Sequence, residues 1–201
     1  RSFVETYHLP AIITNCSNNY GAYQHPEKLI PLMIIHALEG KKLPIYGDGS
    51  NVRDWLHVSD HCAALMAVAE RGRPGETYNV GGGNERNNRD VVGYICDVID
   101  RAFAAEPALA ARFPSCPAAS KQSCRTLISY VTDRPGHDQR YAINANKLAD
   151  ELGERCSVGF EQGLEQTIRW YLAHEDWWRD VTSGAYRSWI ERNYGSRTSA
   201  A

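Results

Sequence analysis

TNCSNNYGAYQHPEKLIP, residues 14–31, connects a short apolar run to a longer one with a different period. Residues 11–14 have the apolar, β-branched character of a strand, and apolar side chains in residues 29–38 repeat with helical spacing. Ligands of open α/β sheets bind at the carboxyl ends of the strands. The polar cluster at this crossing, with Asn18 beside Asn19, therefore predicts a ligand site, although Asn and Gly together are also typical of an ordinary turn.

The composition is that of an ordinary globular protein and limits the classes of partner. The chain has 201 residues, of which 43% are apolar and 23% charged, and its formal net charge is -2. Without a basic run, neither nucleic acid nor an anionic membrane surface is expected as a partner. No run is apolar enough to span a membrane and the first residues lack a signal-peptide layout, so we expect a cytoplasmic protein.

The six cysteines are scattered along the chain, with no closely spaced pair of the CxxC type. This spacing disfavours a zinc ribbon or a disulfide framework in a chain of this length. We therefore interpret most of them as buried free thiols. They are Cys16, Cys62, Cys96, Cys116, Cys124 and Cys156.

Alternating short apolar runs and helical patterns predict an α/β fold with a partly parallel sheet. A helix end is expected at residues 1–7, and Ser59 or Asp60 and Asn88 or Asp90 are expected to cap two helices. Residues 102–120, rich in Ala and Pro, are interpreted as a long loop. The predicted strands are 11–14, 43–46, 51–58, 77–80, 127–131 and 141–143, and the predicted helices are 29–38, 63–70, 88–103, 144–153 and 160–172.

Two motifs of dinucleotide-dependent enzymes are absent from this sequence. No GxxGxxG loop lies between a strand and a helix, because Gly81, Gly82 and Gly83 are contiguous. No tyrosine has a lysine four residues later, the spacing that lowers the pKa of a catalytic hydroxyl in this type of enzyme. We therefore expect the chain to begin within a fold and the catalytic groups to lie upstream of it.

Four motifs resemble the carboxyl-terminal half of the dTDP-glucose 4,6-dehydratases, which are extended short-chain dehydrogenases/reductases. They are SNNYGAYQHPEKLIP (17–31), LPIYGDGSNVRDWLHVSDH (43–61), GETYNVGGGNE (75–85) and DRPGHDQRYAI (133–143). They occur in the family's order and cover nearly the whole chain, with residues 102–125 the weakest part. Ala22 replaces the usual proline and Glu154 a common tryptophan, which puts only the rigidity of the first loop in doubt.

The resemblance implies a domain division and a reaction. Residues 1–40 would be the last part of an NAD-binding Rossmann-like domain, and residues 41–201 mainly a nucleotide-sugar-binding domain, with segments near 54–80 returning to the Rossmann sheet. The complete enzyme would be a homodimer that includes an amino-terminal Rossmann portion and acts on dTDP-glucose. NAD+ would take a hydride from C4, water would leave across C5 and C6, and the hydride would return to C6.

The resemblance also implies three groups of contacts, and it assigns no catalytic residue and no metal ligand to this chain. The nicotinamide would lie beside Cys16, Ser17 and Asn19. The thymine would lie against Pro44, Ile45 and Tyr46. The sugar, the diphosphate and the nucleoside would contact Asn18, Lys28, Leu29, Arg53, Asn88, Arg134 and His137.

Plainer interpretations exist for several of these residues. An isolated arginine such as Arg53 is often half of a structural pair with a neighbour such as Asp54, and a lone lysine such as Lys28 is usually solvated. Tyr46 would otherwise be a half-buried strand residue. The alternatives for the whole protein are a nucleotide-sugar epimerase or decarboxylase of the same superfamily, and a binding module without catalysis.

Three other features favour structural roles. His57 and His61 are four residues apart, but the glutamate of an HExxH zinc motif is absent. Asp150 and Glu151 lie in a helical context and are interpreted as part of a solvated face. The aromatic and apolar residues near the carboxyl end are interpreted as packing anchors: Trp177, Trp178, Tyr186, Trp189, Ile190 and Tyr194.

Overall fold

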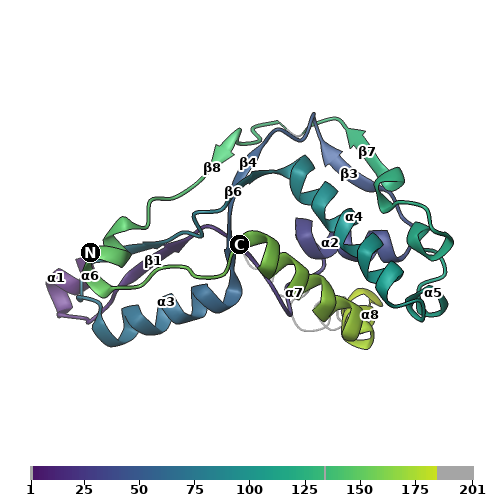
Figure 1. Ribbon diagram of the computed structural model, residues 1–201. Helices are drawn as coiled ribbons and strands as arrows, with labels where there is room; N and C mark the ends of the chain where they lie inside the picture. The colour runs from purple at the N-terminus through teal and green to yellow at the C-terminus, as the bar shows by residue number, and fades with distance from the viewer. Residues whose placement is uncertain (1, 134, 185–201) are drawn as a thin grey trace.

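The computed structural model describes residues 2–133 and 135–184 and has a mixed α/β architecture (Figure 1). Its helices are α1 (Ser2–Tyr7), α2 (Leu29–Leu38), α3 (Val58–Arg71), α4 (Asn88–Ala105), α5 (Leu109–Arg112), α6 (Asn146–Leu152), α7 (Phe160–Ala173) and α8 (Glu175–Thr182). Its strands are β1 (Ile13–Cys16), β2 (Asn18–Tyr20), β3 (Leu43–Tyr46), β4 (Val52–His57), β5 (Thr77–Val80), β6 (Glu85–Asn87), β7 (Ile128–Val131) and β8 (Arg140–Tyr141). Two 3-10 turns are η1 (Pro117–Ser120) and η2 (Cys124–Leu127).

The strands form three small sheets that are mainly parallel. β1 pairs with β5, and β3 pairs with β7 in a register that places Ile45 opposite Tyr130. β4 is the centre of the third sheet, where it pairs in parallel with β2 and β8 and antiparallel with β6. Because β4 touches three other strands, it connects segments that are far apart in the sequence.

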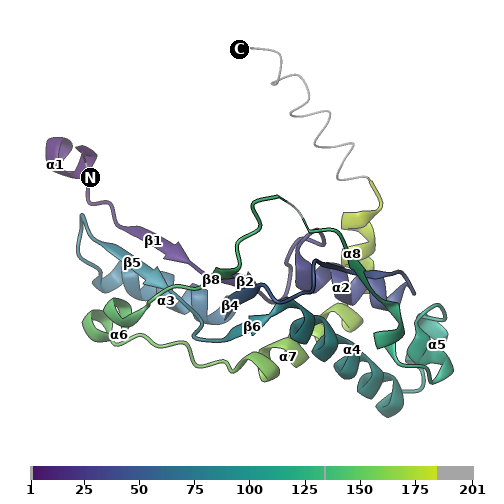
Figure 2. The ribbon, with the colours of Figure 1, turned by 90° about the horizontal axis from the view of Figure 1, so that it is seen from above.

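Two clusters of buried apolar side chains lie on the two sides of β4. The larger cluster includes side chains of α2, β3, α4 and α7, and the smaller one joins β5 to α3 and α6. In Figure 1, α3, α6 and β1 accordingly lie at one end and α2, α4, α5, α7 and α8 at the other. Figure 2 shows α1 standing away from both groups, and none of its residues is buried.

Several predicted elements match the structure closely. α2, β3 and β5 have the predicted bounds, and Gly40, with a positive φ of 67°, follows α2 where a helix end was expected. The first strand is shifted, since it spans Ile13–Cys16 rather than 11–14. The last one is Arg140–Tyr141 rather than 141–143.

The predicted caps of two helices were wrong by one or more positions. The side chain of His57 accepts the backbone N–H of Ser59 at the start of α3, and the side chain of Asn87 accepts that of Asp90 at the start of α4. In each case a polar side chain immediately before the helix reaches its first turn, which is the geometry of an N-cap. Asp60 instead accepts hydrogen bonds from the backbone of Ser157 and Val158.

The predicted loop at 102–120 contains ordered elements. It holds the end of α4, then α5 and η1, and it buries Phe103, Leu109, Phe113 and Cys116 in the larger cluster. Burial of these side chains fixes the backbone despite the Ala- and Pro-rich sequence. β2 and β6, each of three residues, were not predicted either.

The aromatic residues of α8 anchor that helix, as expected. Trp178 is fully buried and its Nε1 donates to the carbonyl of Tyr171 at 3.1 Å. Trp177 packs against the larger cluster. Tyr186, Trp189, Ile190 and Tyr194 lie outside the described residues, so the anchoring predicted for them stays a prediction.

Candidate functional site

Arg53, in the central strand β4, is held by backbone carbonyls. Its side chain donates to the carbonyl of Val52 at 2.7 Å and to that of Asp138 at 2.9 Å, and the residue is 8% exposed. Within residues 2–133 and 135–184, no carboxylate lies within ion-pair distance of its guanidinium. The cation is therefore positioned and not neutralised, which suits an anionic ligand.

Asp54, the neighbour of Arg53, has a separate structural role. Its carboxylate accepts the backbone N–H of Gly82 at 2.9 Å and that of Asn84 at 2.8 Å, and the residue is 1% exposed. A Cβ at Gly82 would lie 2.0 Å from the carbonyl oxygen of Trp55, so this position requires glycine. The structural Arg53–Asp54 pair is thus wrong, and Gly82 allows the 82–84 loop to pack closely against β4.

Tyr46 and His137 come from distant segments and meet at the end of β3. Their ring centroids are 6.3 Å apart with an interplanar angle of 82°. Nδ1 of His137 lies 2.7 Å from the carboxylate of Asp133, and the imidazole is 6% exposed. The Tyr46 residue is 48% exposed, so its ring offers an accessible flat surface beside a fixed imidazole.

The two residues before Tyr46 lie differently with respect to solvent. Ile45 is 3% exposed and packs in the larger cluster, whereas Pro44 is half-buried. Side chains of a strand alternate between its two faces, so Pro44 and Tyr46 share the face opposite Ile45. A ligand on the Tyr46 side of β3 would meet Ile45 through its backbone only.

Asn88 is connected to the surroundings of Arg53 by hydrogen bonds through Asn51. Its backbone N–H donates to the carbonyl of Asn51 at 3.1 Å, and Nδ2 of Asn51 donates at 3.1 Å to the Asp138 carbonyl that Arg53 also contacts. Oδ1 of Asn88 is buried and has no hydrogen-bond partner in the described part of the chain. These bonds connect the backbone of Asn88, through Asn51, to the Asp138 carbonyl beside Arg53, and Asn88 Oδ1 is a buried acceptor that a ligand could satisfy.

A second polar group follows the end of β1. Oγ of Ser17 and Oδ1 of Asn19 are buried without hydrogen-bond partners among the residues described, and Nδ2 of Asn19 donates to the Ser17 carbonyl at 3.1 Å. Asn18 is aligned with Trp55 of β4 in the β2–β4 register, and Cys16 is half-buried at the end of β1. β4 thus links this group to the surroundings of Arg53.

Burial shifts the pKa values of two neighbouring ionisable rings, those of Tyr20 and His57. Burial, with Asp60 and Glu161 nearby, raises the pKa of Tyr20, whose hydroxyl donates to the carbonyl of Phe160 at 3.4 Å. Burial lowers the pKa of His57, and its ring packs edge-on against Tyr20 at 5.3 Å. Tyr20 therefore stays protonated and His57 favours the neutral form.

The remaining polar candidates lie apart or have structural partners. Lys28 pairs with Glu27 at 2.9 Å and its side chain is 60% exposed. Among the described residues, no hydrogen bond or ion pair joins Lys28 or the half-buried Leu29 to Arg53. Glu151 accepts from the Tyr78 hydroxyl at 3.0 Å and from Arg73 at 2.8 Å, which fits a structural role. Arg134 lies outside the described residues.

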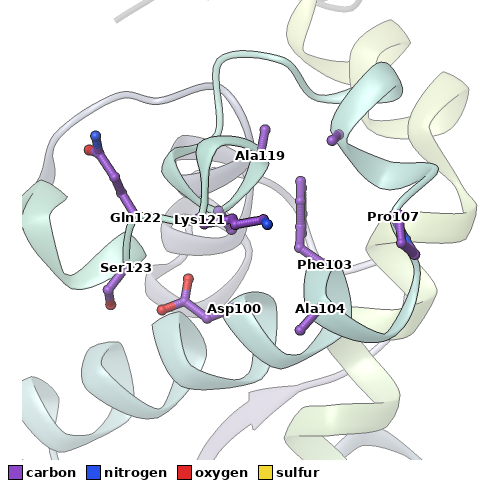
Figure 3. Close-up of a pocket in the computed structure, with 10 residues that line it drawn as sticks. Asp100, Phe103, Ala104, Pro107, Ala119, Lys121, Gln122 and Ser123 are labelled. Carbon is purple, nitrogen blue, oxygen red and sulfur yellow. The ribbon is translucent and has the colours of Figure 1, made fainter.

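Across the described residues, no three His, Cys, Asp or Glu side chains are arranged to hold a metal ion, and no helix has the length and hydropathy needed to cross a bilayer. A cavity of about 640 Å³ lies beside α4 (Figure 3). None of the candidate residues above lines it. Its lining residues are Asp100, Phe103, Ala104, Pro107, Ala110, Ala118, Ala119, Lys121, Gln122 and Ser123.

Comparisons with known proteins identify relatives of this chain. Residues 1–167 match the family model described as GDP-mannose 4,6 dehydratase. A dTDP-glucose 4,6-dehydratase of Escherichia coli is 52% identical over 98% of this chain and 50% of the relative. The chain thus spans about half of the length of the relatives that it matches.

Two solved structures are similar over most of this chain. A dTDP-glucose 4,6-dehydratase of Bacillus anthracis, in complex with NAD, has a TM-score of 0.74 and 49% identity over 90% of this chain and 50% of its own. The enzyme of Streptomyces venezuelae, with NAD bound, has a TM-score of 0.76 and 40% identity over 90% of this chain and 49% of its own. The resemblance in the sequence motifs and the α/β fold are thereby confirmed.

Proposed function

The chain belongs to the GDP-mannose 4,6 dehydratase family, and we propose that it is the nucleotide-sugar-binding portion of a dTDP-glucose 4,6-dehydratase. The complete enzyme would convert dTDP-glucose to dTDP-4-keto-6-deoxyglucose. The observation that carries the proposal is the Arg53 guanidinium, which two backbone carbonyls hold in place without a carboxylate. The identity of 52% to a dTDP-glucose 4,6-dehydratase supports the same choice of substrate.

The diphosphate is assigned to Arg53, His137 and Arg134. Arg53 is oriented by carbonyls and keeps its full charge, while Nδ1 of His137 is occupied by Asp133 and leaves Nε2 for a ligand. A planar guanidinium suits phosphate oxygens because it offers a fork of donors. Asn88, with its unsatisfied Oδ1, would contact the nucleoside, and Asn18, Lys28 and Leu29 would border the sugar phosphate.

The base is assigned to the outer face of β3. Pro44 and Tyr46 lie on that face, and the exposed Tyr46 ring supplies the flat surface that a nucleobase requires. The methyl group that distinguishes thymine from uracil would contact Pro44 or the Ile45 backbone. One methyl group in an apolar site is worth about 1–3 kcal/mol, so dTDP should be preferred to UDP.

The residues after β1 fit a nicotinamide. The unsatisfied Ser17 Oγ and Asn19 Oδ1 provide a hydroxyl and an acceptor for a carboxamide, and Cys16 precedes them. Bound NAD would accept a hydride from the sugar and return it. The side chains named here would only bind and orient the cofactor, because YxxxK and GxxGxxG do not occur in this sequence. The adjacent acidic residues Asp150 and Glu151 do not replace the family's acid–base pair, since Glu151 is bound to Tyr78 and Arg73. The 201-residue chain alone should therefore be inactive.

The resemblance to the dehydratases also supports proposals on assembly. The complete protein would include an amino-terminal Rossmann portion, be a homodimer and act in the cytoplasm. The pairing of β5 with β1 and the packing of α3 beside β5 support a return of residues near 54–80 to the Rossmann sheet. Light scattering on the complete protein would test the dimer, since a monomeric mass contradicts it.

Turnover by the complete protein tests the function. With NAD and dTDP-glucose, mass spectrometry should show a product lighter than the substrate by one water, and the absorbance of NADH should not accumulate. An epimerase would give a product of unchanged mass, and a decarboxylase would require a uronic acid. Binding of dTDP-glucose without any product would instead indicate a module that only binds nucleotide sugars.

A further inference from the structure

Two cysteines of residues 113–124 lie close together in the interior. Sγ of Cys116 is 3.6 Å from Sγ of Cys124, and the two residues are 1% and 0% exposed. Both thiols belong to the larger buried cluster, although the sequence separates them by eight positions. The two sulfurs are thus at contact distance, and a disulfide needs them about 1.5 Å closer, which side-chain rotation can supply.

The backbone on both sides of the pair is fixed by hydrogen bonds. The N–H of Cys124 donates to the carboxylate of Asp100 in α4 at 3.0 Å. The N–H of Cys116 donates to the carbonyl of Phe113 at 3.1 Å, and its own carbonyl accepts from Ala119 at 2.9 Å. These bonds hold the two Cα positions, so the sulfurs meet without a large movement of the backbone.

We propose that Cys116 and Cys124 form a reversible disulfide by exchange with a low-molecular-weight disulfide such as oxidised glutathione. The Cys116 thiolate attacks one sulfur of the small disulfide and releases one glutathione thiolate. The Cys124 thiolate then attacks Sγ of Cys116 and releases the second. Two protons leave the protein thiols, the protein pair loses two electrons, and the glutathione disulfide gains them.

The structure indicates which cysteine attacks first and from which side a small disulfide would approach the pair. The hydrogen bond from the Cys124 thiol lowers the pKa of Cys116, which favours Cys116 as the first thiolate. The cavity of Figure 3 is lined by Ala118, Ala119 and Ser123, which flank the two cysteines, so solvent reaches the outer side of this segment. Both thiols are buried and neither lines the cavity, so exchange with a small disulfide requires local opening of residues 113–124 from the side of the cavity.

The disulfide would act on the strand that supports the proposed base site. Cys124 begins η2, which runs directly into β7, and β7 pairs with β3 along Leu43–Tyr46. Joining Cys124 to Cys116 therefore restrains the entry to β7. This consequence rests on the proposed function, whereas formation of the disulfide does not.

Peptide mapping of the complete protein tests the proposal. The protein is equilibrated in glutathione buffers of increasing oxidation, alkylated while native and again after unfolding, and digested with trypsin without reductant. Cleavage after Arg112, Lys121 and Arg125 places Cys116 in FPSCPAASK and Cys124 in QSCR. We expect one disulfide-linked species of these two peptides, which disappears when dithiothreitol is added.

Variants separate this pair from the other thiols. Cys124→Ser should abolish the linked species and leave Cys116 alkylated or as a glutathione adduct. Cys62→Ser, at the exposed cysteine of α3, is the matched control and should leave the linked species unchanged. The proposal is overturned if FPSCPAASK and QSCR stay separately alkylated under oxidation, if their link forms only in urea, or if either joins the peptide that contains Cys96.

Discussion

Replacing Arg53 by alanine should weaken nucleotide-sugar binding far more than it weakens the fold. The side chain is 8% exposed and donates to the Val52 and Asp138 carbonyls. The Asp138 carbonyl also accepts from Nδ2 of Asn51 at 3.1 Å, so it keeps a partner when the guanidinium is lost. Only the Val52 carbonyl loses a side-chain donor, which costs about 1 kcal/mol of folding free energy.

The expected effect on binding is larger because the proposed bond of Arg53 is to a charged phosphate. A hydrogen bond to a charged group contributes about 1.5–3 kcal/mol. Arg53→Ala should therefore raise the dissociation constant of dTDP about tenfold to a hundredfold. Arg53→Lys keeps the charge and loses the planar fork, so its affinity should fall between those of wild type and Arg53→Ala. NAD affinity should hardly change in either variant.

The measurement is titration calorimetry with dTDP on the complete protein, combined with thermal unfolding of each variant. Arg86→Ala is the matched control, because Arg86 lies opposite Arg53 in the β4–β6 register and binds Glu161 at 3.0 Å on the surface. We expect the control to change the dissociation constant by less than about twofold. Unchanged dTDP affinity with a lowered melting temperature in Arg53→Ala would show that Arg53 is structural, and equal losses in both variants would indicate a nonspecific charge effect.

Three further predictions concern neighbouring residues. Tyr46→Ala should weaken dTDP and UDP binding alike by about 1–3 kcal/mol, because it removes the stacking surface from either base, and calorimetry that finds one nucleotide unaffected would refute this role. Asp54→Asn should lower the free energy of unfolding in urea by about 1.5–3 kcal/mol, since one amide oxygen cannot accept both N–H groups of the 82–84 loop, and a wild-type value would contradict it. Burial lowers the pKa of His57, so the unfolded chain takes up the proton first as the pH falls below about 6.5 and stability is lost towards the folded-state pKa. His57→Asn should therefore show a smaller fall in melting temperature between about pH 7 and pH 5, and an identical fall would exclude this contribution.

The sequence predicted correctly those helices and strands whose apolar pattern lies within the element itself and whose turn residues flank it directly. α2 has a long apolar run and β3 a short one, each followed by turn residues, so their bounds matched the structure. β2 and β6 are too short for a periodic signal and form because β4 offers them a partner. The helix caps were misplaced because several polar residues precede each helix, and the sequence does not show which side chain reaches the free N–H groups.

The sequence predicted which residues belong to the candidate site, but not how they are arranged. The motifs pointed to Arg53 and His137, but the contact between Arg53 and the Asp138 carbonyl joins residues 85 positions apart. The unsatisfied oxygens of Ser17 and Asn88 likewise depend on which groups the fold leaves out of reach. Residues 102–120 have the composition of a loop. The burial of Phe103 and Phe113 could not be predicted from it, because that burial depends on tertiary packing with α2 and α4.

The most direct test of the nucleotide-sugar site is a crystal structure of the complete protein with NAD and dTDP bound. We predict diphosphate oxygens within hydrogen-bond distance of the Arg53 guanidinium, thymine against the Tyr46 face of β3, and the nicotinamide carboxamide beside Ser17 and Asn19. A diphosphate bound elsewhere, with Arg53 still donating only to the Val52 and Asp138 carbonyls, would contradict the assignment.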